Sequence, residues 1–350
     1  MSKKNLKRNS KNIFLIILII FIIIFFFELS LRLIFNQTGS FNCYKKYSDE
    51  RKYSNEKNCY FVERYFEKKT PTIYKTDSNG FRIYEKDNKT IQSKIYFIGD
   101  SFTFGHLSNY IETYPFNAIR YLNNKSSAKF IEINMGVNGY QFRQNLFLIN
   151  KTLNQDIKNS RIIYGLTPND LFDLEEKKQV YSSHKKNNLT DYIKIKIDEI
   201  NLISVKFLTS LLLKNDKIYA FLHNNRGNAA GYINKNSTKF WEEKYKIFEE
   251  ELNELPEETK KKLIITIIPQ QIQIKLLKLN MTDDAISFDR RILSICQKIK
   301  IKCASHTELL AKKMGYDTHY TLDGHLLPMT NIEYGKLLGK YLWYLENINK

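Results

Sequence analysis

The chain of 350 residues is long enough to form one large domain or two small ones, and to bury a sizeable core. Glycine and proline are sparse, at 13 and 6 residues, while tyrosine and phenylalanine number 23 each, which excludes a disordered chain. The formal net charge of +18 comes mostly from lysines scattered among asparagine and isoleucine, with no dense arginine stripe. We therefore expect no nucleic-acid partner, although the charge alone would suggest one.

The N-terminus begins with a basic segment and continues into a long apolar run. Five cations lie within residues 1–12, and residues 13–27 are uninterrupted apolar side chains. With the residues that follow to position 35, the run reaches the ~20 residues that a helix needs to cross a bilayer. No small-residue cleavage site follows it. We expect a basic cytoplasmic tail over 1–12 and an uncleaved transmembrane signal anchor over 13–35, with a buried helix of a soluble domain as the alternative.

Charge gives only a weak indication of which side of the membrane the main domain occupies, because four cations also follow the span within residues 45–52. A long domain crosses a membrane largely regardless of its charge. We therefore expect the N-terminus to be cytoplasmic and the main domain to be extracytoplasmic.

The four cysteines are even in number and lack a Cys-x-x-Cys spacing, so we expect no metal or redox motif. Cys296 is placed near the end of a predicted helix and Cys303 in the strand after it, a geometry that could bring their α-carbons within bridging distance. Cys43 and Cys59 could close a second local loop. Both bridges require an oxidising compartment, and four unrelated cytosolic thiols are the alternative.

Beyond the span, the organisation changes twice. Residues 36–90 are polar and rich in tyrosine, and we interpret them as a stalk leading to a small cap. From 91 to 350, apolar runs of strand length alternate with helix-length segments, which predicts an α/β fold with a parallel sheet. The expected strands are 94–98, 129–134, 160–166, 262–268 and 300–304, and the expected helices are 113–123, 141–153, 238–252 and 288–298.

A helical elaboration is expected at about 175–260, between the third and fourth strands. Residues 193–213 are apolar enough to form one or two helices that pack on the core or on the membrane. Residues 224–237 are rich in asparagine and glycine and are typical of a loop.

Three polar or glycine signals follow predicted strands, and ligands of open α/β sheets bind at the C-terminal ends of strands. Gly99-Asp100-Ser101 follows the first strand, Gly139 lies just after the second, and Asn169 follows the third. A serine that opens a helix, a glycine N–H and an asparagine amide can all donate to an oxyanion. Taken singly, each has an ordinary alternative: a serine N-cap, a turn glycine and a Pro-Asn-Asp turn.

Two Asp-x-His pairs lie near the C-terminus: Asp317-Thr-His319 and Asp323-Gly-His325. In either pair the aspartate could orient the histidine as the base of a serine nucleophile. Solvated loop histidines are the alternative. The six histidines show no ligand spacing, so we expect neither a metal nor another cofactor.

The joint order of these signals resembles the SGNH (GDSL-like) hydrolase superfamily, especially its membrane-anchored bacterial members. Gly99-Asp100-Ser101 resembles the first block, Gly139 the glycine of the second, Asn169 the asparagine of the third, and Asp323 and His325 the last. Residues 77–82 also resemble a segment often found upstream of the first block in anchored members.

The resemblance covers residues 75–345 and implies a three-layer flavodoxin-like fold with a Ser-His-Asp site. Ser101 would be the nucleophile, His325 the base and Asp323 its orienting group. The oxyanion hole would use the N–H groups of Ser101 and Gly139 and the Asn169 amide. The implied activity is that of a serine esterase or acyltransferase.

The chain departs from the family pattern at three places. Only Gly324 separates the last-block aspartate and histidine, where many members have two residues. Leu326-Leu327 follow that histidine in place of a polar residue, and Thr167 stands where the third block usually has glycine.

The implied substrate is an acyl ester, and the expected location suggests a cell-envelope glycan as its carrier. The alternative is a non-catalytic SGNH-like binding or scaffolding domain in envelope polysaccharide assembly. Such a domain would be favoured by a His325 far from Ser101.

Overall fold

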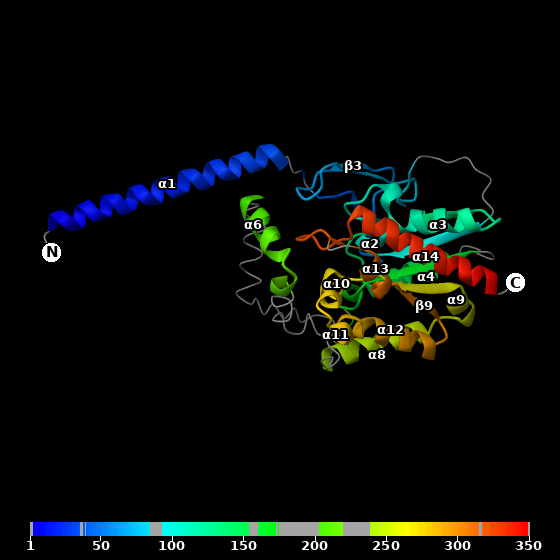
Figure 1. Cartoon of the computed structure of the whole chain (residues 1–350). Coiled ribbons are helices and arrows are strands. Elements are labelled where there is room, and N and C mark those ends of the chain that lie inside the picture. Colours follow the sequence, from blue (N-terminus) through cyan, green and yellow to red (C-terminus); the bar gives the residue numbers. More distant parts are fainter. Residues whose placement is uncertain are drawn as a thin grey trace.

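The computed structural model describes residues 3–35, 38, 40–84, 93–153, 160–172, 174, 203–219, 239–314 and 317–348. The predicted loop over 224–237 and much of the predicted elaboration, 175–202 and 220–238, lie outside these ranges. Figure 1 shows a long N-terminal helix that projects from an α/β body.

A five-stranded sheet forms the centre of the body, and its strand order is β6-β5-β7-β8-β9 with every pair parallel. The strands are β5 (Ser93–Gly99), β6 (Phe130–Asn134), β7 (Arg161–Leu166), β8 (Leu263–Ile267) and β9 (Lys302–Ser305). All five predicted strands are confirmed, each end within two residues of its predicted position. In chain order the arrangement is 2-1-3-4-5, the flavodoxin-like order.

Helices cover both faces of this sheet. Neighbouring residues of each central strand point to opposite sides, so both faces carry apolar side chains that must be buried. In β7, Ile162 and Tyr164 join one buried cluster and Ile163 joins the other. One face is covered by α3 (Tyr114–Lys125), α13 (Thr307–Lys313) and α14 (Pro328–Ile348). The other is covered by α4 (Phe142–Leu153), α8 (Lys239–Asn253), α10 (Gln271–Lys278) and α12 (Ser287–Lys298). The predicted α/β fold in three layers is therefore confirmed.

Short helical elements complete the described part of the body. They are α2 (Ser101–Phe104), η1 (Tyr110–Glu112), η2 (Pro168–Leu171), α6 (Ile203–Leu213), α9 (Glu257–Lys262) and α11 (Thr282–Ala285).

Residues 40–84, here called the cap segment, form two antiparallel hairpins. One pairs β1 (Tyr44–Lys46) with β2 (Tyr53–Asn55), and the other pairs β3 (Tyr60–Glu63) with β4 (Thr72–Lys75). Phe41 and Tyr74 of this segment pack on Phe104 of α2 to form a small aromatic core. The cap segment is thereby attached to the end of β5.

Arg82 makes a second attachment. Its guanidinium donates to the carbonyl oxygens of Phe104, Gly105 and Ser108, at 2.6 Å for Gly105. The side chain is 1% exposed and stacks over the ring of Tyr74. Burial lowers the pKa of Arg82 to about 10, so the guanidinium stays charged at neutral pH. The segment over 77–82 therefore ends in an arginine that fixes the loop after α2.

The N-terminal helix α1 (Lys3–Phe35) begins within the predicted basic tail. Its segment Leu15–Ile34 is long and apolar enough to cross a membrane, and 11% of it is buried. Two disulfides join Cys43 to Cys59 and Cys296 to Cys303, with α-carbons 6.3 and 6.1 Å apart, so both predicted pairings are confirmed. An apolar N-terminal helix, either signal or anchor, together with disulfides indicates a secreted or membrane-associated protein.

Candidate active site

Ser101 opens α2 directly after the C-terminal end of β5. A side chain on Gly99 would place its Cβ 2.8 Å from the carbonyl oxygen of Gly165, so only glycine lets β5 lie this close to β7 here. As the first helical residue, Ser101 has a backbone N–H without an intrahelical acceptor. The strand thus delivers a hydroxyl and a backbone donor to the same edge of the sheet.

His325 faces Ser101 from the loop between α13 and α14. Its Nε2 lies 2.6 Å from Ser101 Oγ, and its Nδ1 lies 2.5 Å from Asp323 Oδ1. Gly324 adopts a φ of +83°, which turns the chain so that side chains only two residues apart meet. The turn is closed by the Gly324 N–H, which donates to the carbonyl of Tyr320 at 2.9 Å. The short Asp-Gly-His spacing is therefore compatible with a triad.

Charge in this triad is arranged so that a fixed carboxylate faces the histidine. Burial raises the pKa of Asp323, but attraction to His325 and His106 and the hydrogen bonds from His325 together outweigh burial, and the pKa falls to about 2. Burial also opposes protonation of His325, but attraction to Asp323 and their hydrogen bond raise its pKa on balance. An ionised Asp323 holds the Nδ1 proton, which leaves Nε2 free to accept a proton from Ser101.

Asp100 links the first and third sequence blocks. Its buried carboxylate caps α2 by accepting from the Phe102 N–H at 2.9 Å, and its second oxygen accepts from Thr167 Oγ1 and Asn169 Nδ2, each at 3.1 Å. Burial raises the pKa of Asp100, and these donors stabilise its charge. Thr167, whose position was singled out in the sequence, thus supplies a donor to Asp100.

Asn169 lies in η2, just beyond β7, and its amide is held beside the start of α2 by Asp100. An amide nitrogen has two hydrogens, so one remains for a second acceptor. Its Oδ1 is buried without a hydrogen-bond partner among the described residues. The predicted oxyanion donor is therefore oriented by the residue that precedes Ser101.

Gly139 lies in the turn after β6 with a φ of +77°. A Cβ there would lie 2.8 Å from Tyr53 Oη, and this hydroxyl donates to the Asn138 carbonyl at 2.9 Å. With its amide in the orientation that satisfies both atoms, Gln141 donates to the Asn169 carbonyl at 2.7 Å. The turn that holds Gly139 is thus fixed by the cap segment on one side and by the Asn169 turn on the other.

His106 and Glu63 are additions that the sequence patterns do not identify. His106 Nε2 lies 3.7 Å from Asp323 Oδ2, and its Nδ1 lies 3.8 Å from Glu63 Oε2. Tyr74 Oη donates to the same Glu63 carboxylate at 2.7 Å. Burial, and then the nearby charge of His325, lower the pKa of His106 to about 4, so this ring is neutral at neutral pH. The second oxygen of Asp323 therefore faces His106, and Glu63 and Tyr74 of the cap segment lie behind this ring.

Glu67 connects the cap segment to the loop that carries the triad. Its carboxylate accepts from the N–H groups of Thr321 and Leu322, each at 3.3 Å. Burial raises the pKa of Glu67. Of His106, Glu63 and Glu67, His106 alone has a sequence signal, because it stands five residues after Ser101. Glu63 and Glu67 lie in a polar, aromatic stretch without periodicity.

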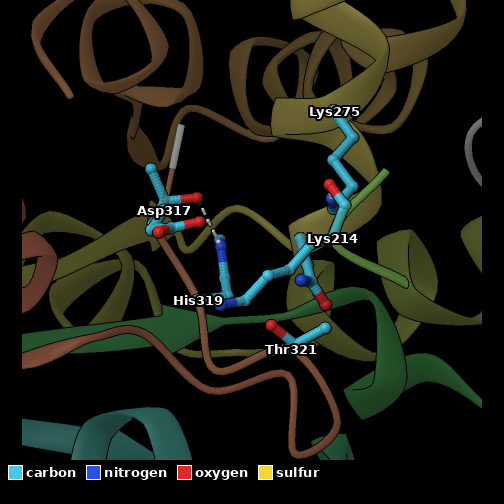
Figure 2. Close-up of a pocket in the computed structure, with 7 residues that line it drawn as sticks. Lys214, Lys275, Asp317, His319 and Thr321 are labelled. Atoms are coloured by element: carbon cyan, nitrogen blue, oxygen red, sulfur yellow. Dashed lines mark hydrogen bonds between the residues drawn. The ribbon is translucent and has the colours of Figure 1, made fainter. Parts of the chain in front are cut away.

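His319, the competing histidine, has a different environment. Its Nε2 contacts the carbonyl of Pro269 at 3.0 Å, and its Nδ1 contacts Thr318 Oγ1 at 2.8 Å. Burial lowers its pKa to about 3, and its neighbour Asp317 is exposed. Figure 2 shows His319 in a small pocket with Lys214 and Lys275. The structure therefore brings His325, rather than His319, to Ser101.

One group of described His, Cys, Asp and Glu side chains is compact enough to ligate a metal ion: His106, Asp323 and His325, with ligand atoms within 4.8 Å of one another. Asp323 Oδ1 and the two His325 nitrogens already take part in the contacts with each other and with Ser101. A cation would compete with these contacts, and we assign no metal here.

Comparisons with known proteins give a likeness in fold. The sequence matches no protein-family model and no curated protein. A lipase/acylhydrolase from Enterococcus faecalis is similar in structure, with 14% identity, a TM-score of 0.41, and coverage of 73% of this chain and 97% of that one. A member of the lipolytic G-D-S-L family from Veillonella parvula has 11% identity and a TM-score of 0.38, over 72% and 99% of the two chains. A carbohydrate acetylesterase from Sinorhizobium meliloti has 12% identity and a TM-score of 0.35, over 73% and 100%.

Proposed function

We propose that the protein is a membrane-anchored serine esterase or acyltransferase that acts on acyl esters. The observation that carries the proposal is the chain of contacts from Ser101 Oγ through His325 to Asp323, at 2.6 and 2.5 Å. A serine hydroxyl is a weak nucleophile until a base lies within hydrogen-bond reach and is itself oriented by a third group. These three side chains meet both conditions.

In the proposed first half-reaction, Ser101 Oγ attacks the acyl carbonyl carbon while His325 Nε2 takes the hydroxyl proton. The carbonyl π electrons move to oxygen, and the resulting oxyanion accepts hydrogen bonds from the Ser101 and Gly139 N–H groups and the Asn169 amide. His325 then returns the proton to the leaving alkoxide as the ester C–O bond breaks. An acyl-serine and an alcohol are the products.

The second half-reaction repeats these steps with a different nucleophile. Water attacks the acyl-serine in a hydrolase, and a sugar hydroxyl attacks it in a transferase, each giving up its proton to His325. Acyl esters of a cell-envelope glycan are the substrate class that fits the proposed location.

The proposed location rests on α1 and the disulfides together. The apolar segment Leu15–Ile34 of α1 would cross the membrane, with the cations that precede it on the cytoplasmic side. Disulfides persist in oxidising compartments, which supports an extracytoplasmic position for the rest of the chain. The 2.6 Å contact between Ser101 and His325 counts against the alternative of a non-catalytic binding or scaffolding domain.

The test uses purified full-length protein in detergent with a short-chain aryl ester and a fluorophosphonate probe. The parent should cleave the ester and carry the probe on Ser101, while Ser101→Ala should lose both, with a rate loss on the order of 10⁴-fold or more. Ser126→Ala, just before β6, is the matched control and should behave as the parent. A folded parent that neither reacts with the probe nor cleaves any short-chain ester would instead support a binding domain.

A further inference from the structure

The helix α6 carries an apolar face that the described residues leave exposed. Leu208, Leu211 and Leu212 are 53%, 49% and 62% exposed. Their spacing of three and four residues places them on one side of the helix. Eleven residues span only ~16 Å, about half the hydrocarbon thickness of a bilayer, so α6 cannot cross a membrane by itself.

The N-terminus of α6 is bonded to α1 through Glu28. The carboxylate of Glu28 accepts from the N–H groups of Ile203 and Ser204 at 3.0 and 2.8 Å. Arg32, one turn further along α1, donates to the same carboxylate at 2.8 Å. A carboxylate is favourable at a helix N-terminus, where the first N–H groups lack intrahelical acceptors. The contact therefore has specific partners on both helices.

The position of Glu28 sets the depth of this contact. Glu28 lies six residues before Ile34, the end of the apolar segment, which corresponds to about 9 Å along a helix. If α1 crosses a bilayer, the start of α6 lies within the half of the membrane that is nearer the body. Figure 1 shows α6 running across the direction of α1 rather than along it. If α1 crosses the bilayer close to its normal, a helix in that orientation runs roughly parallel to the membrane surface.

The other end of α6 is tied to the body, close to the triad loop. Lys275 of α10 donates to the carbonyl of Leu213 at 3.3 Å and to Asp216 at 2.6 Å. Figure 2 shows Lys214 and Lys275 around a pocket with His319 and Thr321, residues of the loop that continues to the triad. One short helix thus joins the membrane segment to the loop that carries the base.

We propose that α6 is an interfacial membrane helix whose leucine face enters the lipid, and that it fixes the height of the active site above the bilayer. The partner is the lipid bilayer itself, because the helix that would cross it also binds the start of α6. The exposed Lys214 at its far end is suited to the lipid head groups. The proposal rests on the anchoring role of α1 given above.

The test places a fluorophore at defined positions of the full-length protein in vesicles of phosphatidylcholine and phosphatidylglycerol. Leu208→Cys and Leu212→Cys are labelled separately with a nitrobenzoxadiazole dye, since the native cysteines are bridged in pairs. Leu309→Cys on α13 is the matched control, because Leu309 is 52% exposed. Cleavage of an aryl ester by each labelled protein, or a near-ultraviolet circular dichroism spectrum equal to that of the parent, verifies its fold.

Nitroxide-labelled lipids should quench the dye at 208 and 212 several-fold more than at 309. Equal quenching at all three positions in vesicle-bound protein would overturn the proposal. So would low quenching at 208 and 212 with crosslinks between copies through these residues, since a second chain would then cover the leucine face. Failure of the parent to float with vesicles is a separate outcome, which overturns the anchoring role of α1 and the proposal with it.

Discussion

At the scale of single residues, the Asp323-Gly324-His325 turn decides which histidine can act. A left-handed Gly324 brings the carboxylate to Nδ1 of His325, while His319 is held by Pro269 and Thr318. A β-branched or bulky side chain at Gly324 would be strained by that backbone conformation alone, because nothing lies within 4 Å of its missing Cβ. The spacing of the pair in the sequence matters less than the conformation of Gly324 between them.

The two histidines should therefore differ sharply on substitution. We expect His325→Ala to lose ester cleavage by about 10⁴-fold or more, because among the described residues His325 is the base that contacts Ser101 Oγ. His319→Ala should keep most of the activity, although it removes a buried ring and should lower the melting temperature. Steady-state kinetics and thermal unfolding of both variants check this. Loss of activity in a folded His319→Ala protein with an active His325→Ala protein would reverse the assignment.

Asn169 allows a test of the proposed oxyanion hole. Asn169→Ala should lower kcat by about 10²–10³-fold, the usual loss for one donor aimed at charge that develops in the transition state. KM should change little, because the ground-state carbonyl carries less charge than the oxyanion. Asp100 keeps its contacts with Phe102 and Thr167, so the fold should persist. Unchanged turnover would leave Asn169 as a turn residue only.

The pH profile of kcat/KM should report the charge of Asp323. His325 must be neutral to accept a proton, so activity falls as the pH drops through its pKa. Attraction to Asp323 raises that pKa, whereas the pKa of Asp323, about 2, keeps its carboxylate charged across the range. Asp323→Asn should therefore shift the acidic limb to lower pH and reduce kcat by about 10⁴-fold through loss of the correct tautomer. A limb that stays in place would separate Asp323 from His325.

At the scale of elements, the cap segment contributes to the site as much as the sheet does. The hairpin β3–β4 carries Glu63 and Tyr74 to His106, and the loop between its strands supplies Glu67 to the triad loop. Arg82 then fixes the chain just after α2. Loss of this segment would remove partners from both loops that carry the triad.

Arg82→Met should destabilise the protein by about 3 kcal/mol or more, because buried carbonyls would lose their donor at roughly 1–3 kcal/mol each. Ester cleavage should fall with it, since the affected carbonyls belong to the loop after Ser101. Arg143→Met is the matched control: its ion pair with Glu251 is partly exposed, and its loss should cost about 1 kcal/mol or less. Chemical denaturation measures both. Equal losses in the two variants would contradict the role given to Arg82.

The sheet could be predicted from sequence because burial on both faces makes each strand a continuous apolar run. Ile162, Ile163 and Tyr164 show this pattern in β7, and the adjoining helices have apolar residues at helical spacing. The positions of Ser101 and Asn169 followed from the same rule, since both stand just after strands. Glu63 and Glu67 could not be predicted, because their partners lie far away in sequence and polar residues between aromatics leave no periodic signal.

At the scale of the whole molecule, two disulfides lie in separate parts of one chain. Cys43–Cys59 closes the first hairpin of the cap segment, and Cys296–Cys303 joins α12 to β9, an edge strand of the sheet. The apolar segment of α1 precedes both bridges. In the proposed orientation, both bridges lie in the oxidising compartment, on the side of the membrane opposite the basic N-terminal residues.

Mass mapping of non-reduced protein from native membranes should recover both bridges, each between the cysteines joined in the structure. The double variant Cys43→Ser with Cys59→Ser, whose bridge has a sequence separation of 16, should lose roughly 3 kcal/mol of unfolding free energy, since a loop of that size constrains the unfolded chain by about this amount. The shorter separation of 7 at Cys296–Cys303 should cost less. Four alkylatable thiols in native protein would place the domain in a reducing compartment, because neither bridge would persist there. The membrane orientation proposed here would then be reversed, while the geometry at Ser101 would be unaffected.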